Sequence, residues 1–278
     1  MKQFILALSF TLFGLLTNAQ NGLENIIVEK YYISDTNDTI ANSIAGALSV
    51  GSVTFRIYAD MLPGYKFQAA FGIPGHELRI ATTTKFFNNQ KKGNIIPNLI
   101  PYINLKDNTV MLDSWLSVGA ASEGSFGILK QEDDTSGTII HEKRFLQNEN
   151  PEAGIPIRIR DGLINGIPSR VTIFGIESDI NIFNNETNGS LFSTTNGSWA
   201  CLKGAIGCDS LSNKVLLAQL TTDGVLSFEL NIQIGTPQGG IERYVAKNPE
   251  GSEIQSSFLM YHSKTVTQPN IKLLKEKN

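Results

Sequence analysis

The clearest pattern along the chain is an alternation of apolar and polar residues with a period of two. In residues 53–61 (VTFRIYADM) every second position from Val53 is apolar, and most positions between them are polar. This period is typical of a β-strand with one buried face. A turn at Pro63-Gly64 follows, and residues 65–71 (YKFQAAF) resume the alternation. These two segments predict neighbouring β-strands.

The same kind of pattern recurs through the rest of the chain. Turns that contain Asn, Gly or Pro separate the patterned segments, and long stretches with helical spacing are missing. Further strands are predicted at residues 76–84, 109–118, 125–130, 155–160, 170–176 and 179–183. We therefore predict an all-β fold, with one antiparallel β-sandwich of the jelly-roll or immunoglobulin-like type.

Residues 214–234 (KVLLAQLTTDGVLSFELNIQI) predict a hairpin with a defined register. A two-residue Asp-Gly turn would pair apolar residues with polar ones. A three-residue turn over 222–224, with Gly224 in the left-handed conformation, instead pairs Leu220 with Leu226. This register places both apolar rows on one face, so we predict the three-residue turn.

The first 19 residues predict a secretory signal peptide. Lys2 precedes an apolar run, and the small residues Thr17 and Ala19 close it. The run is too short for a comfortable bilayer span, which favours cleavage after Ala19 over a membrane anchor. We expect an exported mature chain without a transmembrane segment, located outside the cell, on its surface or in the periplasm.

Composition adds limits to this picture. Lys and Arg number 23 against 26 Asp and Glu, so the formal net charge of the 278-residue chain is −3. Proteins that bind nucleic acids usually carry a basic field, and we expect no nucleic-acid partner. No linker or charge run divides residues 20–264, which predict a single domain. Residues 265–278 form a Lys-rich C-terminal tail.

The only two cysteines, Cys201 and Cys208, lie close together in CLKGAIGC. In an oxidising compartment such a pair favours a disulfide. The C-x-x-C spacing of zinc and redox sites is absent, and the three histidines are scattered. We predict a Cys201–Cys208 disulfide that restrains one surface loop.

Two further groups of residues suggest ligand sites. Asp35, Asn37 and Asp38 offer oxygen ligands at a spacing that can begin a calcium site, although an ordinary Asx-rich turn explains the same residues. Trp115 shares one face of the predicted strand 109–118 with Asp113, where it could stack on a sugar or a partner protein. The alternative for Trp115 is burial beneath a second covered face.

Catalytic motifs fail when they are tested. His141-Glu142 begins like the zinc motif H-E-x-x-H, but Phe145 stands where the second His is required. No G-x-S-x-G elbow and no P-loop occur. Asp113, Asp133 and Asp134 are the carboxylates that a glycoside hydrolase could use, but the sequence does not supply their separation. The pattern favours a protein without enzymatic activity.

Long strings of the chain carry a family resemblance. These are YYISDTNDT, VTFRIYADMLPGYKFQAAFGIPGHELRIATTTKFFNN, DNTVMLDSWLSVGA, NGSWA and LLAQLTTDGVLSFELNIQIG. Over residues 27–262 the chain resembles an uncharacterised β-rich domain of secreted Bacteroidota proteins, particularly those of flavobacteria. Relatives often carry a C-terminal sorting domain for type IX secretion, which implies delivery to the cell surface or the medium. After Tyr261 this chain has a short Lys-rich tail, and we expect the sorting domain to be absent.

We expect an exported, non-enzymatic β-sandwich module that takes part in cell-surface, adhesive or assembly interactions. Its partner would then be an envelope or surface protein. The alternatives are a carbohydrate-binding or carbohydrate-active protein with a glycan ligand, and an accessory subunit of the envelope export machinery. No cofactor is expected apart from the calcium considered above.

Overall fold

The computed structural model describes residues 21–41, 48–107, 109–139, 146, 150–184 and 189–264. The fold is all-β, as predicted, and the described residues contain one short α-helix, α1 (Thr36–Ala41). The predicted signal peptide and the Lys-rich tail lie outside the described residues. The jelly-roll or immunoglobulin-like type stays a prediction.

The strands form four sheets. The central sheet has the order β1 (Leu23–Ile33), β2 (Val53–Met61), β12 (Lys214–Thr222) and β5 (Trp115–Leu116). The six-stranded sheet has the order β16 (Ile254–Gln255), β15 (Ile241–Val245), β14 (Ile232–Gly235), β3 (Lys66–Gly72), β11 (Gly197–Ala205) and β9 (Thr172–Phe174). A third sheet has the order β10 (Leu191–Thr194), β4 (Leu78–Thr82), β13 (Leu226–Glu229) and β17 (Met260–His262). The fourth comprises β6 (Ala120–Ser122), β7 (Ser125–Gly127) and β8 (Leu163–Asn165).

Short 3-10 helices connect these strands. They are η1 (Pro97–Leu99), η2 (Tyr102–Lys106), η3 (Val110–Leu112), η4 (Lys130–Glu132), η5 (Pro151–Ala153), η6 (Asp179–Phe183) and η7 (Ser257–Leu259). All strand pairs within the sheets are antiparallel except β15 and β16, which run parallel.

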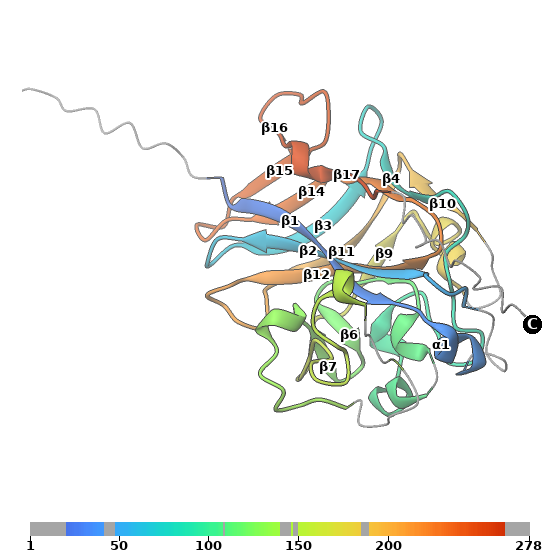
Figure 1. Cartoon of the computed structure of the whole chain (residues 1–278). Helices are drawn as coiled ribbons and strands as arrows, with labels where there is room; N and C mark the ends of the chain where they lie inside the picture. The colour runs from blue at the N-terminus through green and yellow to red at the C-terminus, as the bar shows by residue number, and fades with distance from the viewer. Residues whose placement is uncertain are drawn as a thin grey trace, which may run out of the picture.

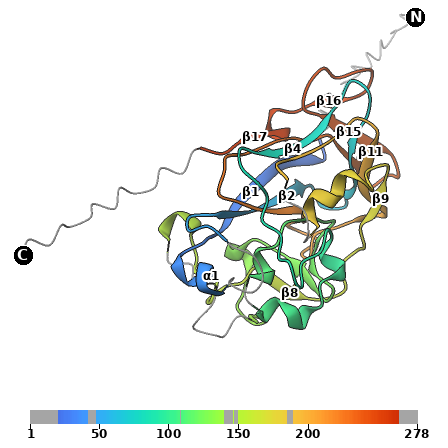
Figure 2. The same ribbon diagram turned by 90° about the vertical axis from the view of Figure 1, so that its right-hand side faces the viewer.

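The central sheet separates two hydrophobic cores. Figure 1 shows β1, β2 and β12 crossing the middle of the molecule, with the two large outer sheets above and the segment from η1 to β8 below. Figure 2, turned by 90°, shows the same order, with α1 and β8 on the lower side. We call the described residues of the lower segment 97–165, apart from β5, the second layer.

Strand β2 contributes side chains to both cores, one from each of its faces. Every second residue from Val53 points into the first core, which the outer sheets complete with Trp199 and Phe228. Tyr58, on the opposite face, belongs to the second core together with Leu216 and Trp115. Burying one such large apolar side chain stabilises the fold by roughly 2 kcal/mol. The alternation seen in the sequence is therefore real, but both of its faces are covered.

The predicted strands were confirmed where the alternation is strongest. Segment 53–61 is β2, and 65–71 and 76–84 contain β3 and β4. Segments 125–130 and 170–176 contain the short strands β7 and β9. The other three predictions were wrong: 109–118 holds η3 and only the two-residue β5, 179–183 is η6, and 155–160 holds no strand. In η3 three consecutive residues are buried, which a half-buried strand would not allow.

The predicted hairpin register was also wrong. Strand β12 pairs with β2 and β5 in the central sheet, whereas β13 pairs with β4 and β17 in the third sheet. Gly224 is not in the left-handed region, and three threonines of the 82–84 segment close around it. Both edges of β12 already have neighbours, so the turn after Thr222 carries the chain into another sheet. The local pattern fitted a hairpin, but tertiary pairing decided the partners.

Candidate functional site

Trp115 and Asp113 are inside the protein, which corrects their assignment as a surface ligand site. Trp115 is buried in the second core, as the alternative interpretation held. The Asp113 carboxylate accepts backbone hydrogen bonds from Asn89 (2.6 Å) and Asn94 (2.8 Å). Burial raises the pKa of Asp113 to about 8, against the lowering effect of these backbone donors. Both residues therefore have structural surroundings, and neither is offered to a ligand at the surface.

Asp35, Asn37 and Asp38 come together at the start of α1. Asp35 Oδ1 accepts the Asn37 backbone N–H (2.7 Å), and Asp38 Oδ2 accepts the Asp35 backbone N–H (2.8 Å). This reciprocal pattern is a capping box. Asp38 also accepts the Tyr32 hydroxyl at 2.8 Å. These oxygens thus have partners within the chain, and the described residues hold no group of three or more His, Cys, Asp or Glu placed to bind a metal. The calcium site stays a prediction.

The structure contradicts the predicted disulfide, because Cys201 and Cys208 are both free thiols. Cys201 points from β11 into the first core beside Trp199. The chain then continues through the rest of β11 to Ala205, and its pairing with β3 is irregular between Ala200 and Ala205. Cys208 follows in the next loop. Burial, and to a smaller extent the negative charge of Asp209, raises the pKa of its thiol. Closeness in sequence did not bring the sulfur atoms together.

The two acidic residues considered for hydrolysis have different surroundings. Asp133 is buried and accepts the backbone N–H groups of Thr135 (2.7 Å) and Gly162 (2.8 Å). Asp134 is exposed and accepts the Ser136 backbone N–H at 2.8 Å. Asp113 and Asp133 are enclosed and Asp134 is exposed, so the structure gives no support to a carboxylate-pair mechanism.

A buried arginine joins the second layer to the central sheet. Arg56 Nε donates to Gln219 Oε1 (2.9 Å), and its Nη1 donates to the Gly162 carbonyl (2.9 Å). The guanidinium also lies over the Tyr31 ring at 3.6 Å. A buried charge is tolerated only with such partners, so Arg56 is a structural tie between two parts of the chain.

A groove of about 360 Å³ runs between β1 and the segments around η4 and η5. At its floor Lys130 Nζ donates to the carbonyl oxygens of Tyr31 (2.6 Å), Ala153 (3.0 Å) and Ile155 (2.7 Å). Burial lowers the pKa of Lys130 to about 8. An ammonium has three donors, and all three are used here. The lysine therefore links the segments that line the groove and offers no hydrogen-bond donor to a ligand.

Three exposed apolar side chains lie on β11 and the loop that follows it. Leu202 is 74% exposed, Ile206 is 46% exposed and Leu211 is 79% exposed. We call these three side chains, with their charged neighbours Lys203 and Asp209, the 202–211 surface. In Figure 1 the turn from β11 to β12 lies at the left end of the molecule, beside the turns after β2 and β14.

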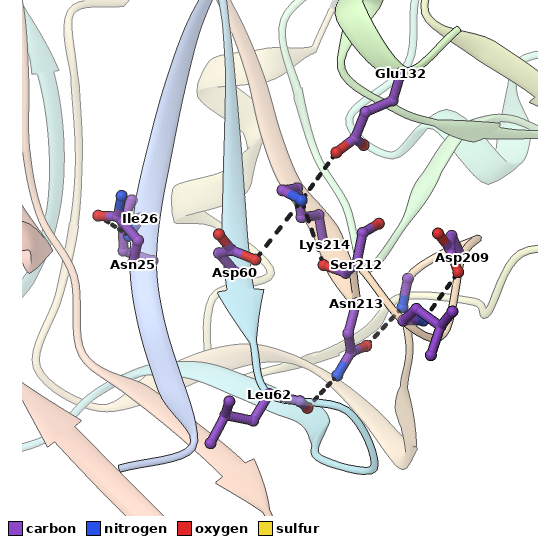
Figure 3. Close-up of polar contacts among 11 residues, drawn as sticks. Asn25, Ile26, Asp60, Leu62, Glu132, Asp209, Ser212, Asn213 and Lys214 are labelled. Carbon is purple, nitrogen blue, oxygen red and sulfur yellow. Dashed lines mark hydrogen bonds and ion pairs between the residues drawn. The ribbon is translucent and has the colours of Figure 1, made fainter. Parts of the chain in front are cut away.

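The loop of this surface is held by one buried side chain, Asn213. Its Oδ1 accepts the Gly207 backbone N–H (3.0 Å), and its Nδ2 donates to the carbonyls of Leu62 (2.8 Å) and Tyr65 (3.1 Å). Figure 3 shows Asn213 reaching from the loop to Leu62. The residue adopts φ 34°, a region that Asn tolerates better than most residues. The apolar side chains are therefore presented on a fixed loop.

Charged groups border the loop on the central sheet. Lys214 Nζ lies 2.8 Å from Glu132 Oε1 and 4.0 Å from Asp60 Oδ1, as Figure 3 shows. Burial lowers the pKa of Lys214, but the carboxylates of Glu132, Asp60 and Asp209 together outweigh it, so the pKa lies above its ordinary value. A small pocket of about 150 Å³ lies here, lined by Cys208 and Asp209 among others. The arrangement offers a polar rim beside an apolar surface, which is how many protein interfaces are built.

Comparison with family models, curated proteins and solved structures finds no match to this chain. Within the described part of the chain, no helix has the length and apolar character that a bilayer-spanning helix needs.

Asn213→Ala is expected to lower the free energy of unfolding by about 2 to 3 kcal/mol. The change removes one buried and two part-buried hydrogen bonds and places alanine in an unfavourable backbone region. Urea unfolding measures the change, and limited proteolysis should cut the variant within 206–213. Asn213→Gly is the matched control for the backbone term. Equal protease resistance of wild type and Asn213→Ala would show that this side chain does not hold the loop.

The 202–211 surface was not predicted from the sequence. Leu202 occurs within strand-like alternation, where an outward leucine cannot be told from an inward one. Leu211 gave a better signal, because it lies between Asp209-Ser210 and Ser212-Asn213, which are turn residues that predict an exposed loop.

Proposed function

We propose that this protein is a non-enzymatic binding module that makes protein contacts through the 202–211 surface. The observation that carries the proposal is the exposure of Leu202 on β11 and of Ile206 and Leu211 on the following loop, which Asn213 holds in place. Apolar side chains of this size gain about 1.5 to 3 kcal/mol each when they become fully buried. A partner that covers them therefore has a favourable driving force.

A fixed loop also lowers the cost of binding. Ordering a mobile side chain at an interface costs roughly 0.5 to 1.5 kcal/mol, and ordering a loop costs more. Here the hydrogen bonds of Asn213 already order the loop in the folded protein, so binding does not have to order it. The surface combines an apolar centre with a charged border, which favours a specific protein contact.

The cellular setting is part of the proposal. The signal-peptide pattern of residues 1–19 and the resemblance to secreted Bacteroidota domains support export to the cell surface or the periplasm. The partner is then an envelope or surface protein, and export machinery is one form it can take. The burial of Trp115 removes the main observation that favoured a glycan ligand.

The test is a pull-down of the tagged protein from its own fractionated cells, with the bound proteins identified by mass spectrometry. Leu211→Asp is expected to lose the specific partner, because a buried unpaired carboxylate opposes the contact. Ile167→Asp is the matched control, since Ile167 is 94% exposed and lies outside the surface. Partners that bind both variants equally would contradict the proposed role of this surface.

A further inference from the structure

We infer that Asp161, Asp133 and Thr138 bind a calcium ion in the second layer, next to the exposed residues 134–136. The site does not involve the 202–211 surface, so it goes beyond the proposed function and is independent of it. It also differs from the turn at residues 35–38 that the sequence suggested for calcium. The observation behind it is a pair of buried oxygen atoms that lack hydrogen-bond partners.

These two oxygens are Asp161 Oδ1 and Thr138 Oγ1, which are buried and have no hydrogen-bond partner among the described residues. Asp161 is 0% exposed, so water at the surface does not reach its carboxylate. Its other oxygen, Oδ2, accepts the Ile139 backbone N–H at 2.6 Å. Buried polar atoms nearly always have a partner in folded proteins, and one that lacks it in the chain points to a bound water or ion.

The chain brings the three side chains together at this place. Thr138 directly precedes Ile139, so the Cα atom of Thr138 is two bonds from the nitrogen that donates to Asp161. Asp133 Oδ2 accepts the Gly162 backbone N–H at 2.8 Å, and the Cα atom of Asp161 is likewise two bonds from that nitrogen. The two carboxylates are therefore neighbours, and the negative charge of Asp133 acts on Asp161.

The negative charge of the two carboxylates is not neutralised by an ion pair. Arg56 attracts Asp161, but its Nη1 donates to the Gly162 carbonyl, and no ion pair in the described part of the chain includes either carboxylate. Burial, together with the charge of Asp133, outweighs Arg56 and backbone donors such as Leu163, and raises the pKa of Asp161 to about 6. A bound cation would stabilise these enclosed carboxylates.

The donor atoms suit calcium better than zinc or magnesium. Zinc prefers nitrogen and sulfur ligands, and the described residues hold no group of three or more His, Cys, Asp or Glu placed for a metal. Calcium accepts about six to eight oxygen ligands in a flexible geometry, whereas magnesium needs a near-ideal octahedron. Two carboxylates and a hydroxyl supply part of this set, and backbone carbonyls and water complete it. The exposed residues 134–136 give water access to the site.

The bound ion joins residues 133–138 to Asp161. Asp161 is in turn linked to β1, because its backbone carbonyl accepts the Tyr31 hydroxyl at 2.6 Å. Calcium therefore stabilises the second layer and its attachment to the central sheet. Extracellular modules bind calcium with dissociation constants of about 0.1 to 1 mM, and the proposed export of this chain places it in that setting.

The test is thermal unfolding of the purified full chain after treatment with a chelator, with and without about 5 mM calcium chloride at constant ionic strength. Calcium is expected to raise the melting temperature by about 3 to 8 °C, the shift that a dissociation constant of about 0.1 to 0.5 mM gives for a chain of this size. Magnesium at the same concentration should give a smaller shift. Isothermal titration calorimetry measures the dissociation constant directly.

Four variants locate the ion. Asp161→Asn should weaken calcium binding about tenfold or more, and Thr138→Val should weaken it about three- to tenfold. Asp134→Asn, at the exposed neighbouring carboxyl, and Asp35→Asn, in the turn suggested by the sequence, should leave it unchanged. Circular dichroism checks that each variant is folded. Thr138→Val keeps both carboxylates, so it tests the site even if Asp161→Asn does not fold.

Two results would overturn the inference. One is a wild-type protein that shows neither a calcium-dependent melting shift nor heat of binding, which would mean that water meets the two unpartnered oxygens. The other is calcium binding that Asp161→Asn and Thr138→Val leave unchanged, which would place the ion elsewhere. Neither result bears on the 202–211 surface, because the pull-down with Leu211→Asp tests that surface separately.

Discussion

Replacing Arg56 with alanine is expected to lower the free energy of unfolding by about 4 kcal/mol. The change removes the bonds to Gln219 and to the Gly162 carbonyl and leaves both acceptor oxygens buried without that donor. It also removes the cation that lies over Tyr31 and reduces the attraction that Glu29 feels. Since these groups join the second layer to the central sheet, the loss should destabilise the whole fold. Urea unfolding followed by tryptophan fluorescence measures it.

Arg243→Ala is the matched control for this prediction. Arg243 Nε donates to Gln233 Oε1 at 3.0 Å, which is the same type of bond as in the buried pair but on the exposed face of β15. An exposed bond of this kind contributes little, so the change should stay within about 0.5 kcal/mol. Similar losses for both variants would mean that burial does not set the strength of the Arg56 contacts.

The free energy of unfolding should fall as the pH rises from about 5 to about 7.5, by about 3 kcal/mol from Asp38 and Asp161 together. Burial is the largest cause that raises both pKa values from the ordinary 3.8 to about 6. The folded protein then holds protons that the unfolded chain has already released. The contribution of such a carboxyl is fully present below pH 3.8 and is lost as the pH passes through about 6. Asp113, whose pKa is raised to about 8, acts in the same direction.

Asp161→Asn separates this effect from the rest of the protein. Asparagine resembles the protonated carboxyl, and Asp161 Oδ1 is buried without a hydrogen-bond partner. The variant should lose about 1.5 kcal/mol of the pH dependence. Asp134→Asn, at an exposed site where the carboxyl pKa is lowered, should leave the slope unchanged. Urea unfolding at several pH values gives both slopes, and a wild-type protein that gains stability over this range would contradict the prediction.

The fold class could be predicted because period-two alternation is a local property. Strand β2 followed its pattern to the residue, since its apolar side faces a large core. The partners of β12 could not be predicted in the same way. Its sequence fits pairing with residues 226–234, but competition from β2 and β5 decides the outcome. Pairing energies between distant strands do not appear in a local pattern.

The candidate site was less predictable, for two physical reasons. Trp115 and Asp113 attracted attention by their chemistry, but the second layer covers the face on which they lie. The cysteines suggested a bond by their spacing, whereas the direction of β11 keeps Cys201 in the core and carries Cys208 into the loop. The exposed leucines drew no attention, because exposure is set by which distant elements fail to cover a residue.

The two covered faces of β2 also constrain how the chain can fold. In a sheet with one wet face, a strand that slips by one residue exchanges buried and solvated side chains. Here the same slip would put Arg56 into the apolar first core and Phe55 among the polar groups beside Gln219. Each core rejects the side chains of the other, so the wrong alignment is penalised twice. Strand β2, which divides the molecule, therefore also disfavours misaligned pairing with its neighbouring strands.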